Sequence, residues 1–196
     1  MMTHENILTS LVTLKARLIN DATTNDIYIG YLPLAHVLEL NSELVMIING
    51  IRIGYSSPTT ITDQSTAIKK GQKGDLNVLR PTLMAAVPAI LERITKAIQS
   101  KIEEGSPIKN SLFKKGYEIK LNKLKKRKSN VLLDKILFSK ISGAILGGRL
   151  KLIATGGAIL NKDVHEFAQT CLCSIIQVYG LSETCAGGML SIFIFM

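Results

Sequence analysis

The 196-residue chain lacks the long apolar runs that mark membrane and secreted proteins. Its apolar residues come in short runs, well under the roughly 18 consecutive positions of a membrane-spanning helix, so no transmembrane helix is expected. Residues 1–6 are mostly polar, whereas a secretory signal needs a basic start and then an apolar stretch. These two absences predict an intracellular protein.

Cysteine is also scarce. Cys171, Cys173 and Cys185 are an odd number, and the first two lie too close together for an ordinary disulfide or a C-x-x-C redox pair. Their spacing to His165 matches no closed zinc site. We therefore expect a reduced compartment, thiols that pack in the interior, and no metal at cysteine.

Two common nucleotide-binding motifs are missing as well. Neither the dinucleotide fingerprint G-x-G-x-x-G nor the P-loop G-x-x-x-x-G-K-[ST] occurs anywhere in the chain. No motif therefore favours NAD binding or a P-loop NTPase.

What the chain does have is apolar content, 46% of its residues, spread along its whole length. That is enough to bury one domain-sized core. Short strand-like runs alternate with longer helical patterns, which is typical of α and β elements around a parallel sheet. We predict an α/β fold that is part of a doubly wound, mainly parallel sheet.

The expected elements follow the chain in order. Thr3 is a candidate N-cap for the first helix, and Pro88 is expected to close a strand before a long helix. The pattern from about 89 to 147 predicts a helical excursion, broken at residues 105–107. The strands are expected at 27–33, 51–56, 82–88, 149–157 and 174–180, and the other helices at 5–20, 34–50, 59–71 and 161–171.

The net charge of +9 is concentrated in one segment. Eight basic residues lie between Lys114 and Lys128, with only Glu118 opposing them. On a helix they would form a broad solvated face, and the alternative is attraction to phosphate or to an anionic membrane surface. The segment lacks interleaved aromatic residues and any recognised nucleic-acid motif, so no specific nucleic acid partner is expected.

The segment QVYGLSETCAGG is the most informative for chemistry. A strand is expected to run into a glycine turn that presents Ser182 and Glu183 side by side. Ligands bind at strand ends in doubly wound sheets, where a hydroxyl can donate to a phosphate oxygen and a carboxylate can bind Mg²⁺. An ordinary surface turn is the alternative interpretation.

A second glycine turn, TGGAIL, contains Gly156 and Gly157, where the missing Cβ lets the backbone approach a flat base or an acyl chain. His36 follows the end of an expected strand, which suits either a helix start or a binding site. His4 and His165 lie in helical patterns and are expected on the surface.

Five segments occur together and in order: YLPLAHVLEL, RIGYSSP, LRPTLMAAVPAILERI, GGRLKLIATGGAIL and QVYGLSET. Together they resemble the eukaryotic long-chain fatty acid CoA ligases of the adenylate-forming, or AMP-binding, superfamily. The resemblance implies a reaction in which ATP and a long-chain fatty acid give an acyl-adenylate and pyrophosphate, after which coenzyme A displaces AMP. It also implies a requirement for Mg²⁺.

By the same resemblance, Glu183 helps to hold Mg²⁺ and Ser182, where the family usually has threonine, contacts phosphate. Tyr179 packs beside the adenine, and Gly180 belongs to the same nucleotide-binding turn. Electrostatic stabilisation of the reacting phosphate would be the main catalytic contribution.

The resemblance also places Gly156, Gly157 and Ala158 along the adenine and acyl pocket, and His36 at the fatty-acid end of the site. It implies peripheral association with an endoplasmic reticulum, mitochondrial or peroxisomal membrane.

The family's phosphate loop is expected before residue 1, and its ribose-binding aspartate and C-terminal lysine after residue 190. We therefore expect residues 1–190 to form an incomplete AMP-binding domain and residues 191–196 to be an apolar tail outside the family pattern. Such a fragment of a ligase is expected to be inactive alone. The alternative is a non-catalytic acyl- or AMP-binding module, or a partner of a full-length ligase.

Overall fold

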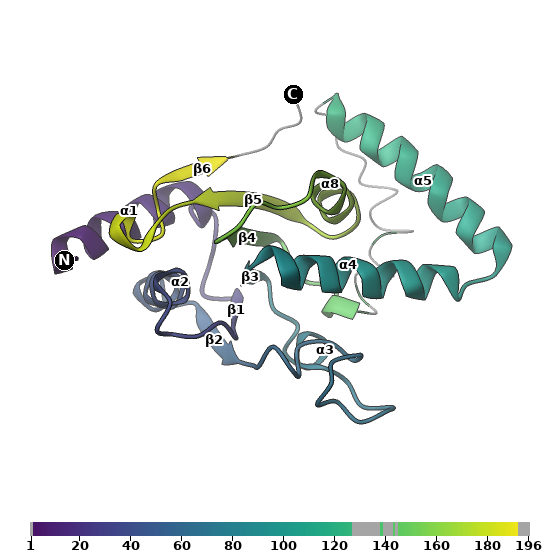
Figure 1. The fold of residues 1–196 in the computed structure, drawn as a ribbon, viewed down its shortest axis with the longest axis horizontal. Coiled ribbons are helices and arrows are strands. Elements are labelled where there is room, and N and C mark those ends of the chain that lie inside the picture. Colours follow the sequence, from purple (N-terminus) through teal and green to yellow (C-terminus); the bar gives the residue numbers. More distant parts are fainter. Residues whose placement is uncertain (1, 127–137, 139–142, 144, 192–196) are drawn as a thin grey trace.

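The computed structural model describes residues 2–126, 138, 143 and 145–191, which build a six-stranded sheet. The strands lie in the order β2-β1-β3-β4-β5-β6, and every neighbouring pair is parallel except β5 with β6 (Figure 1). They are β1 (Ile27–Gly30), β2 (Arg52–Tyr55), β3 (Leu83–Ala86), β4 (Leu152–Gly156), β5 (Ser174–Tyr179) and β6 (Met189–Ser191). The predicted mainly parallel α/β fold is confirmed.

Helices cover both faces of this sheet (Figure 1). The helices are α1 (His4–Leu18), α2 (Val37–Ile48), α3 (Asp75–Leu79), α4 (Pro88–Glu103), α5 (Pro107–Lys125) and α8 (Lys162–Cys171). Successive side chains of β1 point to opposite faces of the sheet, so Tyr28 packs in the core under α1 and α2, and Ile29 packs in the core under α4 and α8. The sheet thus has a core on each face, as expected of a doubly wound fold.

Two helix starts agree with the predicted signals. Thr3 caps α1 through its Oγ1, which accepts the Asn6 N–H at 3.2 Å, while Asn6 Oδ1 accepts the Thr3 N–H at 2.9 Å. Pro88 is the first residue of α4, where an N–H would have no partner within the helix. Local side-chain chemistry therefore fixes both starts.

One predicted helix is wrong. Residues 59–71 form turns, and a short helix that was not predicted, α3, follows at Asp75–Leu79. Hydroxyl groups of Ser56 and Thr60 donate to the Asp75 carboxylate, and Ser65 Oγ accepts the Thr62 N–H at 2.9 Å. Such side-chain bonds compete with helical ones, and they hold this segment in turns instead.

The helical excursion predicted from about 89 to 147 is present as α4 and α5, which meet near Gly105. Residues 127–137 and most of 139–144 lie outside the described part of the chain, as does the tail from 192 to 196. An antiparallel strand, β6, was not predicted and pairs with β5. Within the described ranges, no helix combines the length and the apolar character needed to cross a bilayer.

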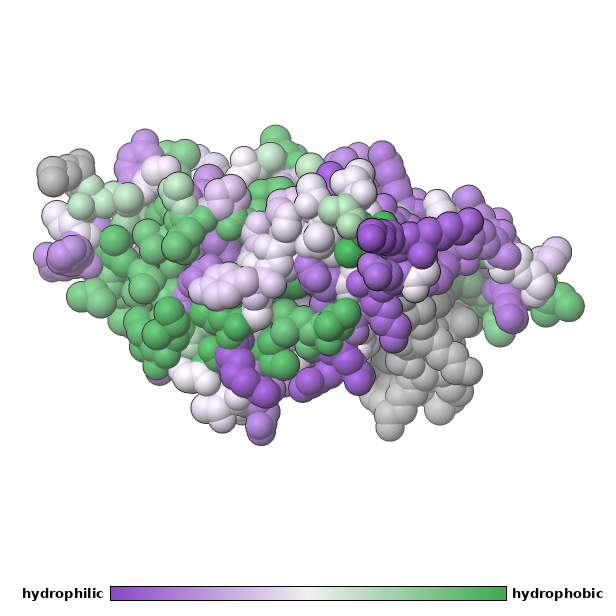
Figure 2. All heavy atoms as spheres, turned by 90° about the horizontal axis from the view of Figure 1, so that it is seen from below, coloured by the Kyte–Doolittle hydropathy of each residue, from purple (hydrophilic) through white to green (hydrophobic). Residues whose placement is uncertain are grey.

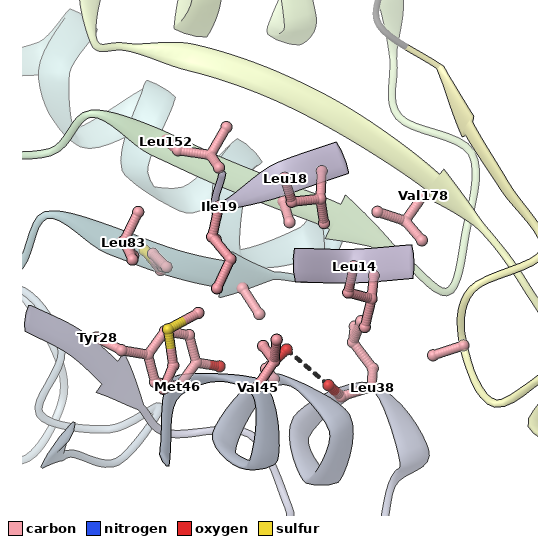
Figure 3. Close-up of a pocket in the computed structure, with 15 residues that line it drawn as sticks. Leu14, Leu18, Ile19, Tyr28, Leu38, Val45, Met46, Leu83, Leu152 and Val178 are labelled. Atoms are coloured by element: carbon pink, nitrogen blue, oxygen red, sulfur yellow. Dashed lines mark hydrogen bonds between the residues drawn. The ribbon is translucent and has the colours of Figure 1, made fainter. Parts of the chain in front are cut away.

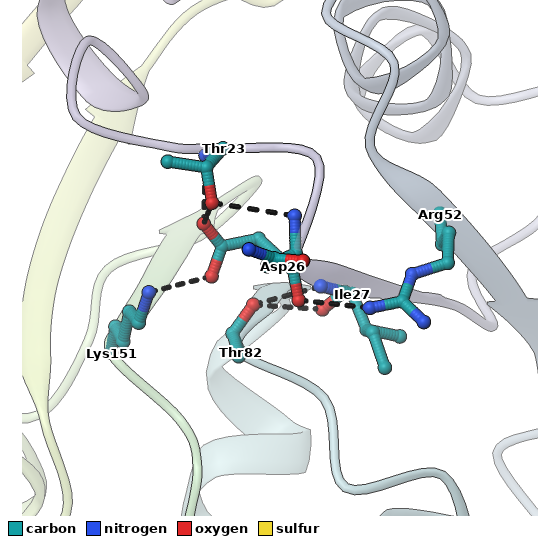
Figure 4. A network of polar contacts seen from close by, with 7 residues as sticks. Thr23, Asp26, Ile27, Arg52, Thr82 and Lys151 are labelled. Atoms are coloured by element: carbon teal, nitrogen blue, oxygen red, sulfur yellow. Dashed lines mark hydrogen bonds and ion pairs between the residues drawn. The ribbon is translucent and has the colours of Figure 1, made fainter.

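A polar network around the buried Asp26 joins the amino ends of three strands (Figure 4). Asp26, just before β1, accepts a hydrogen bond from Lys151 Nζ at 2.7 Å and from the Thr23 N–H at 2.8 Å. Its side chain is 1% exposed. Burial raises its pKa, but the bonds from Lys151, Thr23 and Thr82 outweigh burial and lower the pKa to about 2.

Strand β2 forms one edge of the sheet, and the surface around it carries apolar side chains. Figure 2, which views the molecule from the β2 side, shows these side chains gathered over that face. Among the exposed large side chains of the nearby elements are Tyr55 of β2, Val78 of α3, and Ile47 and Ile48 of α2.

Candidate functional site

The carboxyl ends of β4 and β5 form one side of an open groove of about 600 Å³. The two strands are parallel, with Gly156 paired to Val178, so the loops that follow them leave the sheet at the same edge. Four of the predicted site residues line the groove, namely Gly157, Ala158, Tyr179 and Gly180. The structure therefore brings together residues from the TGGAIL and QVYGLSET segments.

The glycines of these segments are required by close backbone packing. A Cβ at Gly156 would lie 2.8 Å from the Val178 carbonyl oxygen, and one at Gly180 would lie 2.4 Å from the Ala186 carbonyl oxygen. Both contacts are with backbone, which cannot move aside as a flexible side chain can. Gly156 thus lies against β5 beneath the groove, while Gly180 lets the following turn fold back closely.

Ser182 and Glu183 lie in the next turn, the 3₁₀ helix Ser182–Thr184, and their side chains are exposed. Thr184 closes this turn, because its Oγ1 accepts the Leu181 N–H at 2.8 Å. Leu181 itself lines the groove, so the exposed hydroxyl and carboxylate follow directly from its wall. Neither Ser182 nor Glu183 is among the residues that line the groove, so their contact with phosphate and Mg²⁺ stays a prediction.

His36 is not among the residues that line the groove. It is the N-cap of α2, where its exposed side chain accepts the Leu38 N–H on Nδ1 at 3.2 Å. The helix-start interpretation of this residue is confirmed, and its proposed place at the fatty-acid end of a site stays a prediction.

His165 was expected on the surface, and that prediction is wrong. Its side chain is 5% exposed, because α8 packs between the sheet and the long helices α4 and α5. Burial lowers its pKa. His4 is exposed on α1, as expected.

The family of the chain follows from comparison with known proteins. Residues 1–194 match the family described as AMP-binding enzyme. The chain belongs to this family. It is 40% identical over 198 residues to long chain acyl-CoA synthetase 8 of Arabidopsis thaliana, covering 97% of this chain and 27% of that protein. It is 34% identical to long-chain-fatty-acid–CoA ligase 1 of Schizosaccharomyces pombe, covering 96% of this chain and 27% of the relative.

Among solved structures, a long-chain-fatty-acid-CoA ligase from Archaeoglobus fulgidus aligns with a TM-score of 0.57 at 16% identity. The alignment covers 99% of this chain and 31% of the ligase, and at this identity it supports the fold. The chain thus spans about a quarter of the length of the curated relatives, at 27% of each.

In this AMP-binding chain, the sequence alone did not single out Thr155. It is the residue before the glycine pair at the end of β4, it is 2% exposed, and it lines the groove. Its Oγ1 has no hydrogen-bond partner among the described residues. A buried hydroxyl that faces a groove is available to a ligand. The sequence feature that could have identified Thr155 is a hydroxyl residue at the carboxyl end of an otherwise apolar strand.

A second cavity of this AMP-binding fold lies between α1, α2 and the sheet (Figure 3). It is lined by apolar side chains such as Leu14, Val45, Leu83 and Val178, but its volume is only about 40 Å³. That is room for a few water molecules, whereas small-molecule sites usually have several hundred Å³. As it stands, this cavity is too small for an acyl chain.

The thiols of the chain fit the predicted packing in part. Cys171 and Cys185 are each 1% exposed, and Cys173 is half-buried. Burial raises the pKa of Cys171 to about 12, so it stays protonated at neutral pH. Cys171 is thus unsuited to act as a nucleophile.

Proposed function

We propose that this chain supplies the nucleotide-binding groove of a long-chain acyl-CoA synthetase. The observation that carries the proposal is the groove at the ends of β4 and β5, lined by Gly157, Tyr179 and Gly180 and followed by Ser182 and Glu183. The 40% identity to a curated long chain acyl-CoA synthetase supports the same assignment. Long-chain fatty acid, ATP and coenzyme A are the proposed substrates.

In the proposed reaction, a carboxylate oxygen of the fatty acid attacks the α-phosphorus of ATP and pyrophosphate leaves. The thiolate of coenzyme A then attacks the acyl carbonyl carbon, and AMP leaves with the carboxylate oxygen. The residues of this chain would bind and orient the nucleotide. The Tyr179 ring would pack on the adenine, the Ser182 hydroxyl would donate to a phosphate oxygen, and Gly157 would let the base approach the backbone.

Glu183 fits the proposed magnesium site. Its carboxylate is exposed beside the groove, and Mg²⁺ at nucleotide sites is commonly bound by one or two carboxylates together with phosphate oxygens. Bound there, Mg²⁺ would offset negative charge on the phosphates. Ser182 and Glu183 are the groups of this chain that we propose act at the phosphates.

The described residues that line the groove include no lysine or arginine. Cationic groups are a usual means of stabilising the charge that develops on a transferred phosphoryl group. We therefore propose that the 196-residue chain by itself binds nucleotide but completes little turnover. The alternative is a non-catalytic nucleotide- or acyl-binding module.

The test is to titrate the chain with ATP in the presence of Mg²⁺ by calorimetry, and to assay pyrophosphate release with palmitate. Tyr179→Ala should weaken ATP binding about tenfold, because base–aromatic stacking contributes roughly 1–3 kcal/mol. Tyr55→Ala is the matched control, since Tyr55 is 73% exposed and Tyr179 67% exposed, and Tyr55 does not line the groove. The control should bind ATP as the unaltered chain does.

Absence of ATP binding would contradict the proposal, as would equal weakening by both substitutions. Binding without pyrophosphate release is the result expected of the 196-residue chain by itself. Binding with release would contradict that limit on turnover and would exclude the non-catalytic module.

We also propose peripheral attachment to an intracellular membrane through α5. Its outer side carries the exposed apolar residues Ile108 and Leu112, together with the exposed lysines Lys114 and Lys115, and the exposed Lys126 follows its last residue. Apolar side chains beside lysines suit the boundary between anionic headgroups and acyl chains. Arg127 and Lys128, which complete the basic segment, lie outside the described residues.

Sedimentation with vesicles tests this attachment. The chain should bind vesicles that contain about 30% anionic lipid and should be released at high salt, because the attraction is about 1 kcal/mol per basic residue near the surface. The double substitution Lys114→Glu with Lys115→Glu should weaken binding at least about tenfold. Lys69→Glu with Lys70→Glu alters another exposed adjacent pair and should bind normally. Equal loss in both variants would show only an effect of net charge.

A further inference from the structure

The turn that carries Ser182 and Glu183 is attached at its far end to two helices that do not line the groove. The carbonyl oxygen of Cys185 accepts a hydrogen bond from Asn41 Nδ2 of α2 at 2.6 Å and from Ser10 Oγ of α1 at 2.8 Å. Asn41 is 144 positions away from Cys185 in the sequence. Both lone pairs of one carbonyl oxygen are thus used by side chains from distant helices.

This contact is buried, and its three groups hydrogen-bond one another. Asn41 is 0% exposed, Ser10 is 6% exposed and Cys185 is 1% exposed. Asn41 Nδ2 also lies 3.3 Å from Ser10 Oγ, so the amide can donate to both oxygens while the hydroxyl donates to the carbonyl. No water can reach these groups to replace a lost hydrogen bond, so removing one donor leaves the buried carbonyl oxygen without that bond.

The backbone at this point needs support. Cys185 and Ala186 have φ angles of 52° and 62°, a left-handed conformation that residues with a Cβ seldom adopt. Such conformations persist where surrounding contacts hold them. The turn begins at the groove wall with Leu181, so its path to Cys185 sets where the intervening Ser182 and Glu183 side chains lie.

We infer that Asn41, assisted by Ser10, is a positioning residue that holds the turn after β5 in the shape that presents Ser182 and Glu183 to a ligand in the groove. The inference rests on the proposed function for its ligand, and on the hydrogen bonds to Cys185 for its mechanism. Asn41 acts through the backbone of the turn and does not itself line the groove.

Asn41→Asp is the decisive substitution, because it keeps the shape of the side chain and replaces the donor with an acceptor that faces the carbonyl oxygen. Asn49→Asp is the matched control. Asn49 lies at the end of the same helix, and its Nδ2 donates to the Val45 carbonyl oxygen at the same 2.6 Å. The control loses a bond of the same length, at a partly buried position, without touching the turn.

The first readout is alkylation of individual thiols by iodoacetamide, followed by mass spectrometry. In Asn41→Asp, the rate at Cys185 should rise about tenfold or more, as expected for loss of a buried hydrogen bond. The rate at Cys171, which is buried in a different core, should stay unchanged and serves as an internal measure of global unfolding. Asn49→Asp should change neither rate.

The second readout is the affinity for ATP with Mg²⁺, which should fall about tenfold in Asn41→Asp and remain within about twofold in Asn49→Asp. Unchanged alkylation of Cys185 would overturn the inference, and so would faster alkylation with full ATP affinity. If Cys171 also becomes reactive, Ser10→Ala provides the milder variant, and the same two readouts decide. If the unaltered chain binds no ATP, the proposed function fails, while the Cys185 rate still decides whether Asn41 holds the turn.

Discussion

Glu39→Gln is expected to raise the free energy of unfolding by about 3 kcal/mol at pH 8 and to leave it nearly unchanged at pH 4. Glu39 is a fully buried carboxylate on α2, and its Oε2 accepts a hydrogen bond from the Tyr28 hydroxyl at 3.0 Å. Glu43, one turn further along, faces the same point above Gly30. Two carboxylates therefore share a space with little access to water.

The sign follows from the pKa of Glu39, which is raised from 4.5 to about 7. Burial is the largest cause and the charge of Glu43 adds to it, while hydrogen bonds from Tyr28 and from the backbone at Leu32 partly oppose it. The folded protein holds this proton more tightly than the unfolded chain does. Stability therefore falls as the pH rises from about 4.5 to about 7 and then stays constant.

Glutamine removes this dependence, because its amide stays neutral and can still accept from Tyr28. The measurement is urea denaturation of both proteins at several values between pH 4 and pH 8. Glu103→Gln, at an exposed position on α4, is the matched control and should leave the pH profile unaltered. The explanation fails if the unaltered protein is equally stable across this range.

Asp26→Asn should have the opposite effect and lower the free energy of unfolding by about 2 kcal/mol at pH 7. The pKa of Asp26 is lowered from 3.8 to about 2, although burial alone would raise it, because bonds from Lys151, Thr23 and Thr82 outweigh burial. The carboxylate thus stabilises the fold at any pH above about 4, and this contribution is lost as the pH falls toward 2. Asparagine cannot replace the ion pair with Lys151.

The same denaturation series tests this substitution between pH 2 and pH 7. The two proteins should converge near pH 2, where Asp26 becomes protonated in both states. Asp21→Asn, at an exposed position nearby, is the control and should match the unaltered protein throughout. A constant difference at every pH would point to altered packing instead of charge. For these two groups alone, stability should be greatest between about pH 4 and 5.

Much of this fold was contained in the sequence. Strand and helix periods predicted five of the strands, and local chemistry at Thr3 and Pro88 predicted where two helices begin. The groove residue Gly157 was also found, because ligands bind at the carboxyl ends of strands in such a sheet, whereas Tyr179 was named through the resemblance to a known family. Apart from Tyr179, these features depend on neighbours along the chain or on a rule of sheet topology, and both can be read from sequence.

Only the tertiary structure could decide the rest. The turns at residues 59–71 depend on Asp75, which accepts bonds from Ser56 and Thr60 and so overrides a local helical pattern. The burial of His165 depends on which helix packs over α8, and the support of the Cys185 carbonyl depends on Asn41, far away in the sequence. A sequence pattern reports the preference of a segment for its own conformation. It does not report which distant side chain will lie against that segment once the chain has folded, and that contact determined each of these cases.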